Sequence, residues 1–82
     1  MTEKEFEAIY AHTLRNRAEI AHSVRCGCAA CEELFDAADV EEYIDDGQTA
    51  LCPCCGVDAV IGDAAGVELT AELLAELNKK YF

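Results

Sequence analysis

Cys52-Pro53-Cys54-Cys55-Gly56, together with Cys28-Ala29-Ala30-Cys31 earlier in the chain, is the most informative part of this sequence for predicting the fold. Each stretch contains a Cys-x-x-Cys pair, and two residues between paired cysteines let one tight turn present both sulfurs to a single ion. Pro53 fixes φ within its turn, and Gly56 tolerates the positive φ that the exit of such a turn often needs. The sequence therefore predicts a tetrahedral metal site with the ligands Cys28, Cys31, Cys52 and Cys55.

The size of the chain and its N-terminal residues favour zinc over disulfides. An 82-residue chain buries only a marginal core, so a fold of this size usually needs disulfides or a bound metal for stability. The six cysteines could supply either one. Residues 1–10 contain no apolar run typical of a signal peptide, so we predict a cytoplasmic location, where thiols stay reduced and bind metals. No stretch approaches the roughly 18 to 20 apolar residues of a membrane span, and we expect no membrane association. The expected cofactor is one Zn²⁺ per chain.

Several alternatives for this site remain open. Cys26 and Cys54 each lie within two residues of a proposed ligand, and Cys26 could replace Cys28. These two thiols could also trap an oxidised ligand as a disulfide, which would make the site a redox sensor. His22 stands four residues before Cys26 and is a further candidate ligand. The same four thiolates could hold one iron in the rubredoxin manner, which would give a coloured redox protein.

The remaining sequence predicts an α+β fold in a single zinc-ribbon-like domain, residues 1–82, stabilised by the metal. Residues 2–24 show the spacing of an amphipathic helix, with Thr2 and Glu5 as a capping box, and residues 1–24 flank the metal-binding part. A first cysteine knuckle, a helix over residues 37–46 capped by Asp36 and ended by Gly47, and a β-hairpin should follow. The hairpin pairs residues 49–51 with 57–61 and carries the second knuckle at its tip. After a loop over residues 62–66, a final helix begins at Thr70, and its Leu73, Leu77 and Tyr81 face inward.

The charge distribution bears on the partners of the chain. Seventeen acidic residues against six basic ones give a formal charge of −11, and no Lys or Arg occurs between Cys26 and Asn78. Such a surface repels phosphate, which disfavours nucleic acid as a partner and favours a protein partner. An alternative is that the acidic residues between Glu32 and Asp46 mimic nucleic acid and occupy a basic groove of another protein. We expect a monomer or a weak dimer.

No motif in the sequence predicts catalysis. Two thiolate pairs saturate a tetrahedral ion and leave no open position for water, which is typical of a structural zinc site. The sequence contains no Gly-rich phosphate loop and no nucleophile motif. We therefore predict a non-enzymatic interaction or adaptor module.

The run from Asp46 to Gly62, DGQTALCPCCGVDAVIG, resembles a family of small bacterial cytoplasmic proteins of unknown function that contain CPxCG-type knuckles. Arg25-Cys26-Gly27-Cys28 through Cys31 and the terminal Tyr81-Phe82 are also similar to this family. The resemblance implies a zinc-ribbon-like or rubredoxin-like metal centre flanked by helices, and it implies no particular activity. Cys54 departs from the family pattern, in which an aromatic residue is expected inside the knuckle.

Overall fold

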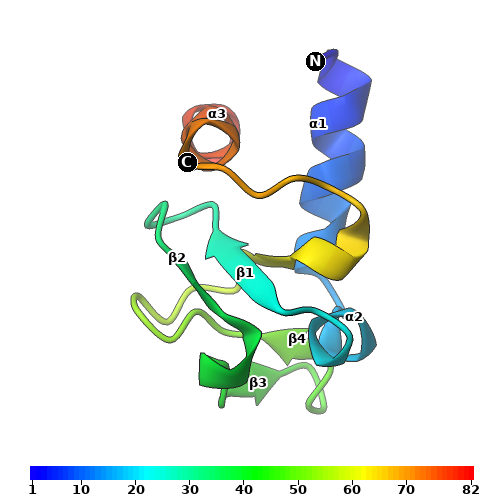
Figure 1. Ribbon diagram of the computed structural model, residues 1–82, viewed down its shortest axis with the longest axis vertical. Coiled ribbons are helices and arrows are strands. Elements are labelled where there is room, and N and C mark those ends of the chain that lie inside the picture. Colours follow the sequence, from blue (N-terminus) through cyan, green and yellow to red (C-terminus); the bar gives the residue numbers. More distant parts are fainter.

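The computed structural model describes residues 1–82 and has an α+β fold built around a small antiparallel sheet (Figure 1). Its helices are α1 (Glu3–Tyr10), α2 (Arg17–Ala21) and α3 (Ala71–Tyr81), and single 3-10 turns lie at Ala11–Thr13, Ala37–Asp39 and Asp63–Ala65. The strands are β1 (Arg25–Cys28), β2 (Leu34–Asp36), β3 (Tyr43–Ile44), β4 (Thr49–Ala50) and β5 (Val60–Gly62). None of the helices combines the length and apolar character that crossing a bilayer requires.

Strand β1 is the centre of the main sheet and lies between β2 and β5, antiparallel to both. Cys26 pairs with Phe35 on one side and with Gly62 on the other, and Cys28 pairs with Val60. Cys26, Gly27 and Cys28 are all buried, because the chain covers both faces of this short strand. Strands β3 and β4 form a separate two-stranded sheet at the opposite end of the molecule from α3 (Figure 1).

The expected helix over residues 2–24 is wrong in its length. Thr2 and Glu5 form the predicted capping box, but α1 ends at Tyr10 and a second short helix begins only at Arg17. Between them, the buried side chain of Asn16 donates to the carbonyls of His12 and Val60 and accepts from the N–H of Ala50. Asn side chains compete with helical hydrogen bonds, and these tertiary contacts outweigh the helical spacing.

The helix expected over residues 37–46 is also wrong, because only the 3-10 turn Ala37–Asp39 forms there. Val40 is extended, and the chain continues into β3, as the β-branched and aromatic residues of this segment favour. Asp45 and Asp46 then adopt φ of +55° and +59°, followed by Gly47 at +79°, and make the turn into β4. Aspartate tolerates this left-handed conformation better than most residues do.

The expected hairpin between residues 49–51 and 57–61 does not form, although both segments contain short strands. Strand β4 pairs with β3, so that Tyr43 lies opposite Ala50, whereas β5 pairs with β1. The second knuckle therefore connects two sheets instead of closing one hairpin. The segment expected as a loop over residues 62–66 contains the 3-10 turn Asp63–Ala65.

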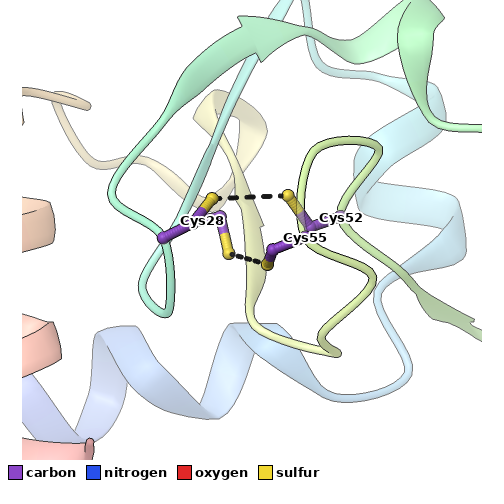
Figure 2. A group of neighbouring side chains, drawn as sticks. Cys28, Cys52 and Cys55 are labelled. Atoms are coloured by element: carbon purple, nitrogen blue, oxygen red, sulfur yellow. Dashed lines mark hydrogen bonds between the residues drawn. The ribbon is translucent and has the colours of Figure 1, made fainter.

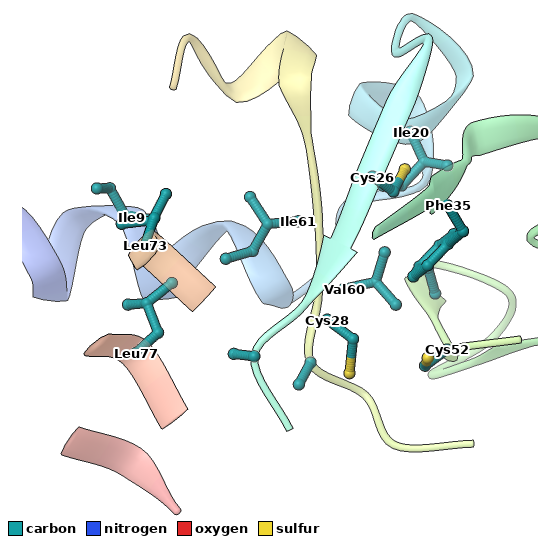
Figure 3. Packing of buried hydrophobic residues seen from close by; sticks show 13 residues of the cluster. Ile9, Ile20, Cys26, Cys28, Phe35, Cys52, Val60, Ile61, Leu73 and Leu77 are labelled. Carbon is teal, nitrogen blue, oxygen red and sulfur yellow. The ribbon is translucent and has the colours of Figure 1, made fainter. Parts of the chain in front are cut away.

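Helix α3 agrees with the prediction and covers the sheet. Thr70 accepts a hydrogen bond from the N–H of Leu73 as N-cap, and Leu73, Leu74 and Leu77 are buried. Figure 3 shows Leu73 and Leu77 facing the cluster that includes Ile9 and Ile61. Gly27 permits this packing, since a Cβ there would lie 2.9 Å from Leu74 Cδ1. At the end of the helix the ring of Tyr81 stacks on that of Tyr10 at a centroid distance of 4.0 Å.

Candidate metal centre

The first knuckle begins where β1 ends. The N–H of Cys28 donates to the carbonyl of Glu33, and the carbonyl of Cys28 accepts the N–H of Glu32 at 2.8 Å. The chain therefore turns back on itself between Cys28 and Glu33, with Glu32 at a φ of +63°. This turn brings the sulfur of Cys31 to the same side as that of Cys28.

The second knuckle repeats this geometry. The carbonyl of Cys52 accepts the N–H of Gly56 at 2.9 Å, and the N–H of Cys52 donates to the carbonyl of Val57. Gly56 has a φ of +78°, the positive value that the sequence predicted for the exit of this turn. In addition, the backbone N–H of Cys54 lies 3.3 Å from the sulfur of Cys52 and donates to it. Inward N–H groups of this kind favour a thiolate at that position.

The two knuckles face each other and bring all four predicted sulfurs together (Figure 2). The sulfurs of Cys28 and Cys55 are 3.6 Å apart and those of Cys31 and Cys52 are 3.7 Å apart, so each short contact joins one knuckle to the other. All four sulfurs lie within 4.8 Å of one another. In a regular tetrahedron with zinc–sulfur bonds of about 2.3 Å, neighbouring sulfurs are about 3.8 Å apart. The donor set and its spacing thus fit one tetrahedral ion.

Disulfides do not account for these contacts. A disulfide requires sulfurs about 2.05 Å apart, whereas the two closest pairs are at 3.6 and 3.7 Å. All six cysteines are free thiols in this structure.

The protein environment affects the four thiols unequally. Burial raises the pKa of Cys31 to about 11 and also raises the pKa of Cys28, which is fully buried. Burial acts in the same direction on Cys52, but the N–H groups of Cys55 and Cys54 outweigh it, and the net pKa of Cys52 is lowered. Without a cation, Cys28 and Cys31 are therefore protonated at neutral pH, and a bound ion must displace their protons.

One side of the centre is closed and the other is open to solvent. Cys28 and Cys52 are buried, Cys31 is half-buried and Cys55 is exposed. On the closed side, Ala29 and Ala59 are fully buried, and the N–H of Ala29 donates to the carbonyl of Ala59. This backbone contact links the two knuckles independently of any metal.

Asn78 supports the first knuckle, and we did not predict this role from the sequence. Its side-chain amide donates to the carbonyls of Ala29 and Ala30 at 3.1 and 2.9 Å, so that α3 holds both residues between the paired cysteines. Its position four residues after Leu74 places it on a buried helix face, where an amide needs a partner. A polar residue on an otherwise apolar stripe was the available signal.

The alternative ligands lie outside the sulfur cluster. Cys26 is fully buried beside Ile20 in the core (Figure 3), and its burial raises its pKa to about 11. His22 is exposed, with its ring Nδ1 2.8 Å from the carbonyl oxygen of Ala18. Cys54 is exposed at the tip of the second knuckle. The cluster therefore contains Cys28 and not Cys26, and neither histidine belongs to it.

Comparison with known proteins adds no further constraint: no family model matches the chain, and it has no significant match among curated proteins or solved structures. The knuckle-type site consequently rests on the geometry of its four cysteines.

Proposed function

We propose that this chain is a non-enzymatic domain in which Cys28, Cys31, Cys52 and Cys55 hold one structural Zn²⁺, and that it serves as a protein-interaction or adaptor module. The observation that carries the metal site is the set of four sulfurs within 4.8 Å of one another, contributed in pairs by two matching turns. Four thiolates are the ligands that zinc takes in structural sites.

The structural role follows from what the ion would connect. The two knuckles belong to segments twenty residues apart, and the second knuckle leads from one sheet to the other. When bound, the ion supplies a cross-link between these segments and neutralises part of the charge of the thiolates. Structural zinc contributes on the order of 10 kcal/mol to the folding of small domains. Four protein ligands complete the tetrahedron, so no position is left for a substrate or a reactive water.

Charge supports a protein partner. The formal charge is −11, and the exposed carboxylates between Glu32 and Asp46 have a single ion pair among them, between Asp36 and Arg25. Unpaired surface carboxylates repel phosphate and attract cationic protein surfaces.

The metal part of the proposal is tested by native mass spectrometry and elemental analysis on protein purified under reducing conditions without added metal. The expected result is one zinc per chain. One iron per chain and a red colour would replace the structural role with electron transfer. A folded chain without any metal would contradict the proposal.

The knuckle itself provides a matched pair of variants. Cys52→Ala removes a buried ligand and should abolish stoichiometric zinc binding and cooperative unfolding. Cys54→Ser changes an exposed thiol two residues away and should leave both unchanged. Equal zinc content in the two variants would show that the cluster is not the binding site.

The interaction part is tested separately, by chemical cross-linking of the tagged chain in cells followed by mass spectrometry. A protein that is cross-linked to the wild type and to Cys54→Ser, but not to Cys52→Ala, would support a role that depends on the folded domain. The absence of any reproducible cross-linked protein would argue against an interaction module.

A further inference from the structure

We propose that the groove between α1 and α3 binds a basic amphipathic helix of a partner protein. The groove has a volume of about 850 Å³ and is bounded by α1, by the first half of α3 and by residues 65–70 that lead into α3. This inference rests on the proposed interaction function and specifies its surface and the class of its partner.

The floor of the groove is apolar. Phe6 and Ile9 contribute from α1, and Val67 and Leu73 contribute from the other wall. Ile9 and Leu73 are each 7% exposed and lie side by side at the edge of the core (Figure 3), whereas Phe6 and Val67 remain half-buried. Covering the two half-buried side chains would remove further apolar surface from water.

The rim of the groove is acidic. Glu5, Glu68, Glu72 and Glu76 line it and are all exposed, and no Lys or Arg is among its lining residues. None of these four carboxylates takes part in an ion pair. Glu72 and Glu76 are also one helical turn apart on α3, where like charges destabilise a helix by roughly 0.2 to 0.5 kcal/mol. A cationic partner would relieve this repulsion.

The positive groups near the groove are few and partly occupied. His12 lines one part of the groove, but its ring nitrogen is 2.9 Å from a carboxylate oxygen of Glu19. Lys80 lies outside the lining, over the ring of Phe6, and is paired with Glu3. The α-amino group belongs to Met1, at the N-terminal end of α1. The electrostatic potential in the groove is therefore negative and is dominated by these four carboxylates.

The apolar floor and the acidic rim of the groove together favour a basic amphipathic helix as its ligand. An amphipathic helix presents an apolar stripe at every third or fourth position and can carry Lys or Arg on its flanks, so its apolar side chains meet the floor and its cations meet the rim. A helix about 10 Å across rises about 5.4 Å per turn, so a groove of this volume suits about two turns. A second copy of this chain is disfavoured because each copy has a formal charge of −11.

The test uses the zinc-loaded full chain and two synthetic peptides with blocked ends. The first peptide places Leu along one helical stripe and Lys elsewhere, and the second has the same composition in scrambled order. Binding is followed by fluorescence anisotropy, and the binding face is mapped by amide chemical shifts. The patterned peptide should bind more tightly than the scrambled one and shift the amides of Phe6, Ile9, Val67 and Leu73.

Two double charge reversals distinguish binding in the groove from a general effect of the net charge of the protein. Glu72→Lys with Glu76→Lys should weaken binding of the patterned peptide by at least about tenfold, since two exposed ion pairs become repulsive. Glu41→Lys with Glu42→Lys makes the same change in net charge at exposed positions outside the groove and should have a much smaller effect. Ala8→Trp, an exposed lining position on α1, keeps the net charge and should block the groove.

The outcomes distinguish this inference from the function on which it rests. Three outcomes would each contradict binding in the groove. They are equal binding of the two peptides, equal loss of binding in the two charge-reversed variants, and unchanged binding by Ala8→Trp. Loss confined to Glu41→Lys with Glu42→Lys would move the interaction to another surface and leave the interaction function standing. Zinc content and cooperative unfolding, measured on every variant, report on the metal site independently of peptide binding.

Discussion

Glu32 and Gly56 occupy equivalent positions in the two knuckles. Each directly follows the second cysteine of its pair, each has a positive φ, of +63° and +78°, and each donates its N–H to the carbonyl of the first cysteine. The two turns are thus built in the same way although only one contains the glycine that this conformation favours. The first knuckle retains a non-glycine residue in a strained position.

Exchanging glycine at these two positions should change stability in opposite directions. Glu32→Gly relieves a left-handed residue but increases the freedom of the unfolded chain, and we expect a net gain of about 0.5 kcal/mol in the free energy of unfolding. Gly56→Ala introduces the strain and should cost about 1 to 2 kcal/mol. Urea unfolding of the zinc-loaded chain measures both. Glu33→Gly, at a position without positive φ, is the matched control and should be destabilising; a gain there would refute the strain argument.

Chelation should unfold the chain. Because the proposed zinc ion connects two segments of a small core, an excess of a strong chelator should abolish the cooperative thermal transition seen by circular dichroism, and added zinc should restore it. Cys54→Ser should respond in the same way as the wild type. A transition temperature that is unchanged by the chelator would mean that the apolar core alone supports the fold.

Replacing Asn78 should lower both the stability of the chain and its affinity for zinc, although Asn78 is not one of the proposed ligands. Asn78→Ala leaves the carbonyls of Ala29 and Ala30 without the amide and should lower the free energy of unfolding by about 1 to 3 kcal/mol. It should also weaken zinc binding in competition with a chromogenic chelator, since the first knuckle loses its contact with α3. Lys79→Ala, on the exposed side of the same helix, should change neither quantity. Equal effects of the two substitutions would show that Asn78 does not support the first knuckle.

Zinc binding should release protons. The raised pKa values of Cys28 and Cys31 keep both thiols protonated at neutral pH in the metal-free chain, so binding should release at least about two protons per zinc. Calorimetry in buffers of different ionisation enthalpy measures this number. Heats that do not depend on the buffer would show that the thiolates exist before the metal arrives.

The stability of the zinc-loaded chain should depend on pH. Burial raises the pKa of Cys31 to about 11, so protons compete with the ion for the sulfurs, and the free energy of unfolding should fall as the pH falls below neutral. Urea unfolding of the zinc-loaded chain at neutral and at acidic pH measures this change. A free energy of unfolding that is the same at both would show that protons do not compete with the metal.

The sequence predicted the local features of this fold and missed the distant pairings. The cysteine pairs and the caps at Thr2 and Thr70 depend on residues at most four positions apart, and the structure has each of these caps and brings the four sulfurs together. The α+β class was also predicted correctly.

The errors have tertiary causes. Asn16 interrupts the expected N-terminal helix through contacts with Ala50 and Val60, more than thirty residues away. Residues 37–46 have helical spacing, but Asp45 and Asp46 make a turn that lets β3 pair with β4. The partner of β5 is β1 and not the neighbouring strand, and no local pattern predicts such a choice. Asn78 stands out as a polar residue on an apolar helical stripe, but the sequence does not show that its partners are the carbonyls of Ala29 and Ala30.

Gly27 and Cys28 are adjacent in β1, and the first packs under Leu74 of α3 while the second belongs to the sulfur cluster. One peptide unit thus joins the hydrophobic core to the metal centre. With zinc at the four sulfurs, the lifetime of the chain in a cell would follow the local supply of zinc, since proteases degrade chains that unfold. Its abundance would then report metal sufficiency without any dedicated sensor.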